Sequence, residues 1–429
     1  MGNRSMRQNG ISRRAVLGMA SLGWGMGSRT ASSAEARALE VAAFPLIDEI
    51  VRQALPRWQR LHPGVDLRIS SRQYIDHHTA MTTALSTSTY LPDVMALEVS
   101  FVGRFAQGGG LEDLRQPPFA IEQHRERWVR AAYEQATARS GAVVAAPADV
   151  GPGTMLYRHD LLARAGVSID EMTRSWDDYI AAGRKIKSAT GAYLVSHVQS
   201  VKDIAIRVGL APGEGLYFDR DSRVRVQSPR FVRAFELARA IRREKLDARI
   251  GTWSNEWAEG LKRGTLATEL GGAWLVGQLN KWVAPGTAGQ WRASHFPENT
   301  FAPYGGAFYA IPRRSDPQRK ALAWDFVRMM TLERDRQFAA FKGYDAFPAL
   351  IETHDDPFFG EPLAFLGGQK ARLLWREAAR RMAAAPVHKQ NGFADEVVGT
   401  ELDNVLDRGK DIGRALADAA RLLERRAKR

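Results

Sequence analysis

Apolar residues recur with two different periods along the first part of the chain. Leu39–Phe44 is a mostly apolar stretch, as expected of a buried strand. Within Ile47–Leu61 the apolar side chains return every three or four residues, which predicts a helix. In Val65–Ser70 they alternate with polar ones, as on a half-buried strand. A strand, a helix and a strand within about 30 residues predict a βαβ unit, and therefore a parallel sheet.

The same two periods continue along the chain and predict an α/β fold. Further strands are expected at Asp93–Leu97, Leu266–Leu270 and Phe308–Ile311. Further helices are expected at 74–88, 101–106, 253–263, 316–332 and 401–428, and after Ser175 and Ser228. Gly409 and Gly413 weaken the middle of the last helix, because glycine is a poor helix former.

Val143–Asp160 interrupts this regular pattern. An apolar run up to Ala146 stops at Pro147, and Thr154–Tyr157 resumes as a second apolar run. We predict two strands joined by a short irregular crossing that contains Asp149. The carboxylate of Asp149 could face a cleft between two lobes; the alternative is an ordinary connection with a solvated carboxylate.

Residues 1–36 have the composition of an export signal. Four arginines precede a weakly apolar stretch, and Ser12–Leu17 resembles the twin-arginine export motif. Small residues follow, so we expect cleavage near Ala34 or Ala36 and a periplasmic protein. A basic disordered tail is the alternative. The chain has no cysteine, which excludes a lipoprotein anchor and disulfides.

Composition and length are those of a globular protein. Without the 36-residue leader, 429 − 36 = 393 residues remain, enough for two domains or one large two-lobed domain. The formal net charge is +13, but basic residues are mixed with acidic ones and form a dense run only at Arg425–Arg429. We therefore expect no nucleic-acid binding. No stretch after the leader approaches the ~20 apolar residues that span a bilayer.

Five segments, in order and with suitable spacing, match one family. They are Leu91–Leu111, Pro147–Leu162, Ser175–Ile186, Gly271–Trp274, and Tyr304–Ile311 with the helix that follows it. These segments resemble the extracellular solute-binding proteins of ABC importers, most closely the group that includes the maltose- and trehalose-binding proteins.

The resemblance implies a two-lobed periplasmic-binding-protein fold of type II, with hinged α/β lobes and a ligand cleft between them. The N-terminal lobe would contain residues 37–146 and 298–345, and the C-terminal lobe residues 147–297 and 346–429. Three crossings would join them near Val143–Asp149, Ser294–Pro303 and Tyr344–Leu350. The implied partner is an ABC permease in the membrane, and we expect a monomer.

The resemblance also implies which residues bind the ligand. Glu98 and Asp149 match positions whose carboxylates accept hydrogen bonds from sugar hydroxyls. Trp274 matches a tryptophan that stacks on the sugar. Tyr304-Gly305-Gly306 matches a segment whose backbone approaches the ligand closely, where glycine helps because it has no side chain. Tyr74 is a weaker candidate.

Three functions remain open from the sequence. The first is a carbohydrate-binding protein that performs no chemistry. The second is an enzyme that uses Glu98 and Asp149 on a glycoside; no nucleophile or metalloprotease motif supports it. The third is a binding protein for a non-sugar solute such as glycerol phosphate, a polyamine or another anion or metabolite, and the excess positive charge slightly favours an anion. We expect no cofactor, and the histidine pair His77-His78 lacks the spacing of metal ligands.

Overall fold

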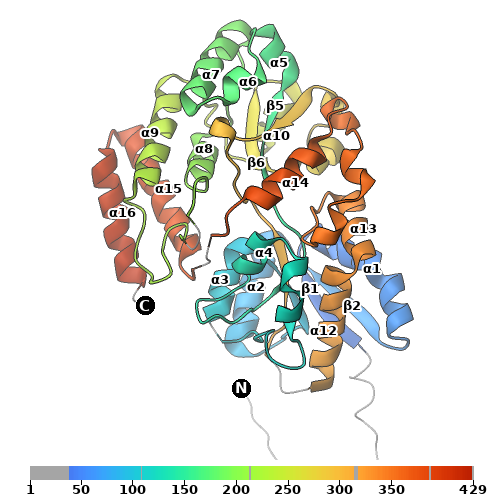
Figure 1. Cartoon of the computed structure of the whole chain (residues 1–429). Helices are drawn as coiled ribbons and strands as arrows, with labels where there is room; N and C mark the ends of the chain where they lie inside the picture. Colours follow the sequence, from blue (N-terminus) through green and yellow to red (C-terminus); the bar gives the residue numbers. More distant parts are fainter. Residues whose placement is uncertain (1–37, 108, 212–213, 314–316, 386–387, 428–429) are drawn as a thin grey trace, which may run out of the picture. The chain divides into compact units, whose positions relative to one another are not determined.

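A parallel βαβ unit opens the fold, as the sequence predicts. The computed structural model describes residues 38–429, apart from 108, 212–213, 314–316, 386–387 and 428–429. Strands β1 (Ala38–Ala43) and β2 (Asp66–Ser71) pair in parallel and are connected by helix α1 (Ile47–Leu61) (Figure 1). Pro56 lies within this helix.

The first sheet has five strands in the order β2-β1-β3-β8-β4. Strand β3 (Val94–Glu98) is parallel to β1, whereas β8 (Ala307–Ala310) is antiparallel to β3 and to β4 (Ala146–Pro147). The sequence places a strand in the run before Pro147 and a break at the proline. Instead the strand is two residues long and includes Pro147, because β4 lies at the edge of the sheet, where a missing N–H group costs no ladder bond.

The second sheet is antiparallel and has three strands. Strand β5 (Gly153–Arg158) lies in the centre, between β6 (Thr268–Gly272) and β7 (Trp291–Ser294). The buried apolar residues form two clusters. Val41, Met95 and Tyr309 of the first sheet belong to one, together with Leu156 and Trp291 from one face of the second sheet, whereas Met155 from its other face belongs to the second cluster. Two separate cores of this kind are typical of two lobes that fold around two sheets.

Helices surround both sheets (Figure 1). Those close to the first sheet in sequence are α2 (Tyr74–Thr87), α3 (Val99–Gln107), α4 (Arg130–Gln135), α12 (Pro317–Leu332) and α13 (Arg334–Tyr344). The others are α5 (His159–Arg164), α6 (Ile169–Thr173), α7 (Trp176–Thr190), α8 (Val198–Ala205), α9 (Pro229–Arg243), α10 (Asn255–Arg263), α11 (Leu275–Gln278), α14 (Ala371–Arg381), α15 (Asn391–Arg408) and α16 (Ile412–Ala427). In the part of the chain that the structure describes, every helix is too short or too polar to cross a bilayer.

The C-terminal region contains two helices where the sequence predicts one. Helix α15 begins ten residues earlier than expected, at Asn391, and ends at Gly409, whose φ of 68° is left-handed. Helix α16 then packs back against α15 and α9 (Figure 1). The reason is the glycine that the sequence marks as a weak point: left-handed backbone at the end of a helix favours glycine and terminates the helix.

Three chain segments come together where the chain passes between the sheets. The first passage, 148–152, leads from β4 to β5, and the second, 295–306, leads from β7 to β8. Their backbones are hydrogen-bonded: the Ala148 N–H donates to Ala307, and the Tyr304 N–H to Gly151. The third segment joins them through the N–H of Val150, which donates to Phe347.

Gly151 is needed for this close approach. A Cβ atom at residue 151 would lie 2.1 Å from the carbonyl oxygen of Tyr304, far inside van der Waals contact. Only glycine, which has no Cβ atom, leaves room there for the carbonyl group of Tyr304.

Candidate functional site

Glu98 ends strand β3 and is held by two donors. In the ladder it stands opposite Ala307 of β8. Its Oε2 atom accepts hydrogen bonds from the Tyr74 hydroxyl at 3.0 Å and from the Ser100 N–H at 2.8 Å. Burial raises the pKa of Glu98, although these hydrogen bonds and the charge of Arg207 oppose the shift. Glu98 and Tyr74, two of the predicted residues, are therefore in direct contact.

His78 is hydrogen-bonded to the backbone of both Glu98 and Tyr74. The Glu98 N–H donates to Nε2 of His78 at 3.1 Å, so Nδ1 must hold the proton that is donated to the Tyr74 carbonyl at 2.7 Å. The imidazole also stacks on Phe101, with 3.9 Å between ring centroids. Burial lowers the pKa of His78 to about 4, so the ring is neutral at physiological pH and positions Tyr74 and Glu98 without adding charge.

Asp149 lies in the first passage between the sheets. Its Oδ1 accepts a hydrogen bond from the N–H of Ala307 at 2.7 Å, and its backbone forms a β-bridge with Pro348. Burial, with a smaller contribution from the negative charge of Glu98, raises the pKa of Asp149 to about 7 against the opposing effect of the hydrogen bond from Ala307. The two predicted carboxylates therefore influence one another, and Ala307 contacts both residues through its backbone.

Tyr304, Gly305 and Gly306 directly precede Ala307 and are partly accessible to solvent. Gly305 has a φ of 90° and Gly306 a φ of 130°, both in the region that favours glycine. The carbonyl of Tyr304 accepts a hydrogen bond from the Trp274 indole at 3.0 Å, and the carbonyl of Gly306 accepts one from the Val99 N–H. Residues 304–307 thus contact elements of both sheets.

Trp274 is part of an aromatic group that the sequence did not reveal. Its ring stacks on Trp253 with 5.9 Å between centroids and 17° between planes. Trp253 keeps 52% of its surface exposed and also contacts the buried Trp257. From the sequence Trp253, like Tyr74, is a weaker candidate for a ligand contact, and core or rim packing is favoured. The whole of α10 separates it from Trp274, and only the tertiary fold brings the two rings together.

Arg207, just beyond helix α8, is a residue that the sequence reasoning missed. Its guanidinium lies 5.5 Å from the centroid of the Tyr304 ring, an arrangement in which a cation is attracted to the aromatic face. Nη1 donates to the carbonyl of Asp203 at 2.6 Å, and 24% of the side chain stays exposed. The sequence gave no signal for Arg207, because it is one of many arginines scattered along helices.

Together these residues offer three kinds of contact around residues 304–307. Glu98 and Asp149 offer carboxylate oxygens that accept hydrogen bonds, and Arg207 offers donors. Trp253 and Trp274 offer aromatic surface for C–H groups. Of the predicted residues, Tyr74 reaches this region only through its bond to Glu98.

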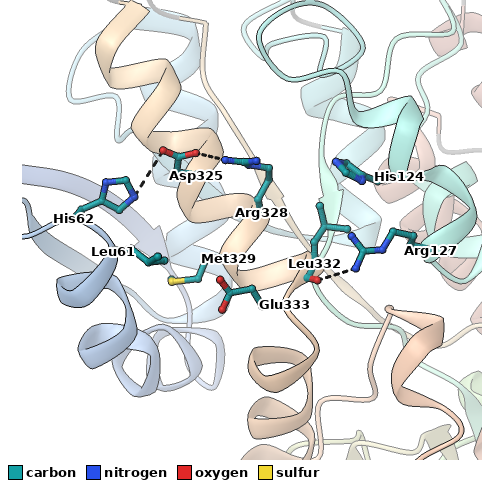
Figure 2. Close-up of a pocket in the computed structure, with 9 residues that line it drawn as sticks. All are labelled: Leu61, His62, His124, Arg127, Asp325, Arg328, Met329, Leu332 and Glu333. Atoms are coloured by element: carbon teal, nitrogen blue, oxygen red, sulfur yellow. Dashed lines mark hydrogen bonds and ion pairs between the residues drawn. The ribbon is translucent and has the colours of Figure 1, made fainter.

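A surface hollow elsewhere on the molecule is lined by arginines that are already paired with other groups of the protein. It has a volume of about 420 Å³ and lies between the end of α1, the segment around Arg127, and α12 (Figure 2). Its arginines are already paired: Arg127 bonds Glu352 and the carbonyl of Leu332, and Arg328 bonds Asp325. None of the residues predicted from the sequence lines this hollow.

Known proteins are similar to this chain in sequence and in fold. A lactose-binding protein from Rhizobium radiobacter is 23% identical over 396 residues, which cover 84% of this chain and 88% of that protein. The crystal structure of an extracellular solute-binding protein of family 1 superposes with a TM-score of 0.77 at 21% identity, over 91% of this chain and 99% of the other. The binding protein from B. animalis subsp. lactis Bl-04 in complex with β-1,6-galactobiose superposes with a TM-score of 0.70 at 21% identity, over 91% and 98% of the two chains.

These likenesses agree with the two sheets and two cores, and they show the two-lobed periplasmic-binding-protein fold that the resemblance implies. The family model of the bacterial extracellular solute-binding proteins matches residues 42–337, more than two thirds of the chain. The protein belongs to the bacterial extracellular solute-binding protein family.

Proposed function

We propose that this protein captures a carbohydrate between its two lobes and delivers it to the membrane permease of an ABC importer. The observation that supports this most directly is the arrangement around residues 304–307, where two carboxylates and Trp274 contact one segment of backbone and Trp253 stacks on Trp274. Sugars combine hydroxyl donors with apolar C–H faces, so acceptors beside aromatic rings suit them. The names of the similar proteins, which bind lactose and β-1,6-galactobiose, support the same class of ligand.

In this proposal Glu98 and Asp149 accept hydrogen bonds from hydroxyls, and Trp274 covers one face of a sugar ring. Tyr304, Gly305 and Gly306 bring backbone close to the ligand, and Tyr74 orients Glu98. Closure of the lobes about the three passages buries the ligand. No bond is made or broken, so a bound saccharide is released intact.

We also propose how the protein is exported and in which compartment it works. The export signal lies in residues 1–36, outside the described residues; we propose that it is cleaved near Ala34 or Ala36 and that a monomer works in the periplasm.

The lobe boundaries proposed from the sequence place residues 37–146 with 298–345, and 147–297 with 346–429. Strands β1, β2, β3 and β8 fall in the first set, and β5, β6 and β7 in the second.

A thermal-shift screen followed by calorimetry tests the function. The panel contains lactose, β-1,6-galactobiose, maltose, sugar alcohols, glycerol 3-phosphate and spermidine. A ligand at 100 times its Kd adds about 2.7 kcal/mol to the free energy of unfolding, which raises Tm measurably. Binding of a saccharide that is recovered uncleaved supports the proposal. Binding of glycerol phosphate or spermidine alone would establish a non-sugar solute instead.

A further inference from the structure

Gln337 of α13 is almost completely buried, with 3% of its surface exposed. Its Nε2 donates to the carbonyl of Ala148 at 2.7 Å and to that of Met330 at 2.9 Å. Its Oε1 accepts hydrogen bonds from the N–H groups of Ala349 at 3.1 Å and Leu350 at 3.3 Å. A side-chain amide has two N–H groups and two lone pairs on its oxygen, so all of its hydrogen-bonding capacity is used.

This amide lies between two of the passages that connect the sheets. Ala148 begins the first passage, and residues 349–350 end the third, which runs from 345 to 350. Within the bridge that joins the two passages, Asp149 stands opposite Pro348, which has no N–H group to donate. Gln337 supplies a donor to one passage and an acceptor to the other, and so ties them together where main-chain bonding is incomplete.

The joined passages are anchored to the elements around the first sheet. The Ala148 N–H donates to Ala307 of β8, and the Ala349 carbonyl accepts a hydrogen bond from Val129, directly before α4. Through Met330, the same amide is bonded to the last turn of α12. The start of the first passage and the end of the third are therefore fixed to one body.

Glycines lie directly beyond this anchored part. Gly151 and Gly153 follow in the first passage, and a Cβ atom at Gly153 would lie 2.4 Å from the carbonyl oxygen of Ala302 in the second. In the second passage, Gly305 and Gly306 have φ values of 90° and 130°. Glycine changes φ and ψ without a Cβ clash, so the backbone bends most easily at these residues.

We propose that Gln337 is a positioning residue that joins the first and third passages into one unit, so that the lobes close by bending at the glycines beyond it. The inference rests on the proposed closure of the lobes about a ligand. Asp149 lies in the joined segment, directly after Ala148. Fixing the Ala148 carbonyl therefore also fixes the position of the Asp149 backbone relative to the first sheet.

A purely structural role for Gln337 makes a different prediction. If the amide only satisfied buried backbone groups, its removal would lower Tm, but the lobes would keep the same range of separations. Thr268 of β6 offers a matched control, because it is also fully buried and its hydroxyl bonds the Tyr179 hydroxyl and the Leu194 carbonyl. Thr268→Val removes these bonds without altering a passage. The range of lobe separations is therefore the informative measurement.

The experiment measures the distance between the lobes in the ligand-free protein by double electron–electron resonance. The chain contains no cysteine, so two exposed residues, one in each proposed lobe, can be replaced by cysteine and spin-labelled: Ser86 of α2 and Glu236 of α9. The labelled proteins are otherwise wild type, Gln337→Met, Gln337→Glu and Thr268→Val. Circular dichroism and Tm check that each is folded. Because no ligand is added, the result does not depend on which solute binds.

Gln337→Met keeps the length of the side chain but loses the amide, so it should widen the distribution of distances at least about twofold. Gln337→Glu keeps an acceptor for residues 349–350 but has at most one donor for two carbonyls, so its width should lie between those of wild type and Gln337→Met. Thr268→Val should match wild type. If Gln337→Met does not fold, the comparison of Gln337→Glu with wild type decides.

Equal widths in the wild type and the folded Gln337 variants, or a Thr268→Val distribution as wide as that of Gln337→Met, overturn the inference. A narrow wild type beside a wide Gln337→Met supports it. This holds even if no saccharide of the thermal-shift panel binds, and saccharide binding stands even if the widths are equal, so the two proposals fail separately.

Discussion

The indole Nε1 of Trp274 donates a hydrogen bond to the carbonyl oxygen of Tyr304 over 3.0 Å. Trp274 lies two residues after β6 of the second sheet, and Tyr304 lies three residues before β8 of the first. The bond thus fixes an aromatic ring that follows a strand of the second sheet onto a passage that leads to the first. It also sets the plane of the ring, because the donor atom is part of the indole.

Replacing Trp274 should weaken saccharide binding. We expect Trp274→Ala to raise Kd at least tenfold, since it removes a partly buried contact worth about 1.4 kcal/mol or more. Trp274→Phe keeps an aromatic face but loses the donor to Tyr304, so its Kd should lie between the two. Calorimetry with the best saccharide of the panel measures this, and Trp282→Ala, which alters an exposed ring at 61% exposure, is the control. Equal Kd values in wild type and Trp274→Ala would remove Trp274 from the site.

Adding one methyl group at Gly151 should destabilise the protein. The new Cβ would lie 2.1 Å from the Tyr304 carbonyl oxygen, so two passages must move apart. We expect Gly151→Ala to lower the free energy of unfolding by about 1–3 kcal/mol, as overpacking does. Gly392→Ala is a matched control in α15, where a Cβ meets nothing within 4 Å and alanine favours the helix. Denaturant unfolding of both variants measures the difference; no loss in Gly151→Ala would contradict the close approach.

Saccharide affinity should depend on the ionisation of Asp149. Its pKa in the free protein is about 7. A ligand hydroxyl that donates to the carboxylate stabilises the ionised form, so ligand binding lowers the pKa and releases a proton. Affinity should therefore rise as pH increases from 6 to 8, by at most about tenfold per pH unit, and then level off. Calorimetry at several pH values measures the trend, which Asp149→Asn should flatten. A fall in affinity over this range would mean that protonated Asp149 is the binding form.

Glu269 should make the folded state less stable as pH rises. This buried residue of β6 accepts a hydrogen bond from the Trp257 indole at 3.1 Å, and burial raises its pKa from 4.5 to about 7. The folded protein therefore keeps a proton that the unfolded chain releases above about pH 4.5. Its contribution to stability is complete below the unfolded pKa and is lost as pH rises to about 7, by up to ~1.4 kcal/mol per pH unit.

Glu269→Gln tests this directly, because glutamine keeps the acceptor oxygen and cannot ionise. Denaturant unfolding at pH 5 and pH 8 compares the variant with wild type. The free energy of unfolding of the variant, relative to that of wild type, should be higher at pH 8 than at pH 5. Parallel curves for the two proteins would show that Glu269 does not titrate in this range.

The buried ammonium of Lys202 should be important for stability. It is 2% exposed and links α8 to Asp395 of α15. Lys202→Ala leaves Asp395 without its ion-pair partner and Asp203 with Arg207 alone, and removing one partner of a buried pair costs about 3–5 kcal/mol. Lys185→Ala, which removes an exposed lysine paired with Glu171, should change stability by less than about 1 kcal/mol. Thermal and denaturant unfolding compare the two variants.

The sequence by itself determined the fold class and most of its elements. Periodicity within Ile47–Leu61 and the flanking strands predicted the βαβ unit, because the burial of one helix face and one strand face leaves a local pattern. The family resemblance identified Glu98, Asp149 and Trp274 as candidates. It did so through short motifs, in which each residue is recognised by its immediate neighbours.

Only the tertiary structure decided what surrounds those candidates. Trp253 and Arg207 lie far from Tyr304 in sequence, and no local pattern distinguishes an exposed tryptophan or a scattered arginine from any other. The same holds for Pro147, which belongs to β4 because the sheet places that strand at its edge. Periodicity shows which side of a helix or strand is buried. Which residues from distant parts of the sequence lie side by side in a site depends on the tertiary fold. That fold brings residues 304–307 between the two carboxylates, the tryptophans and Arg207.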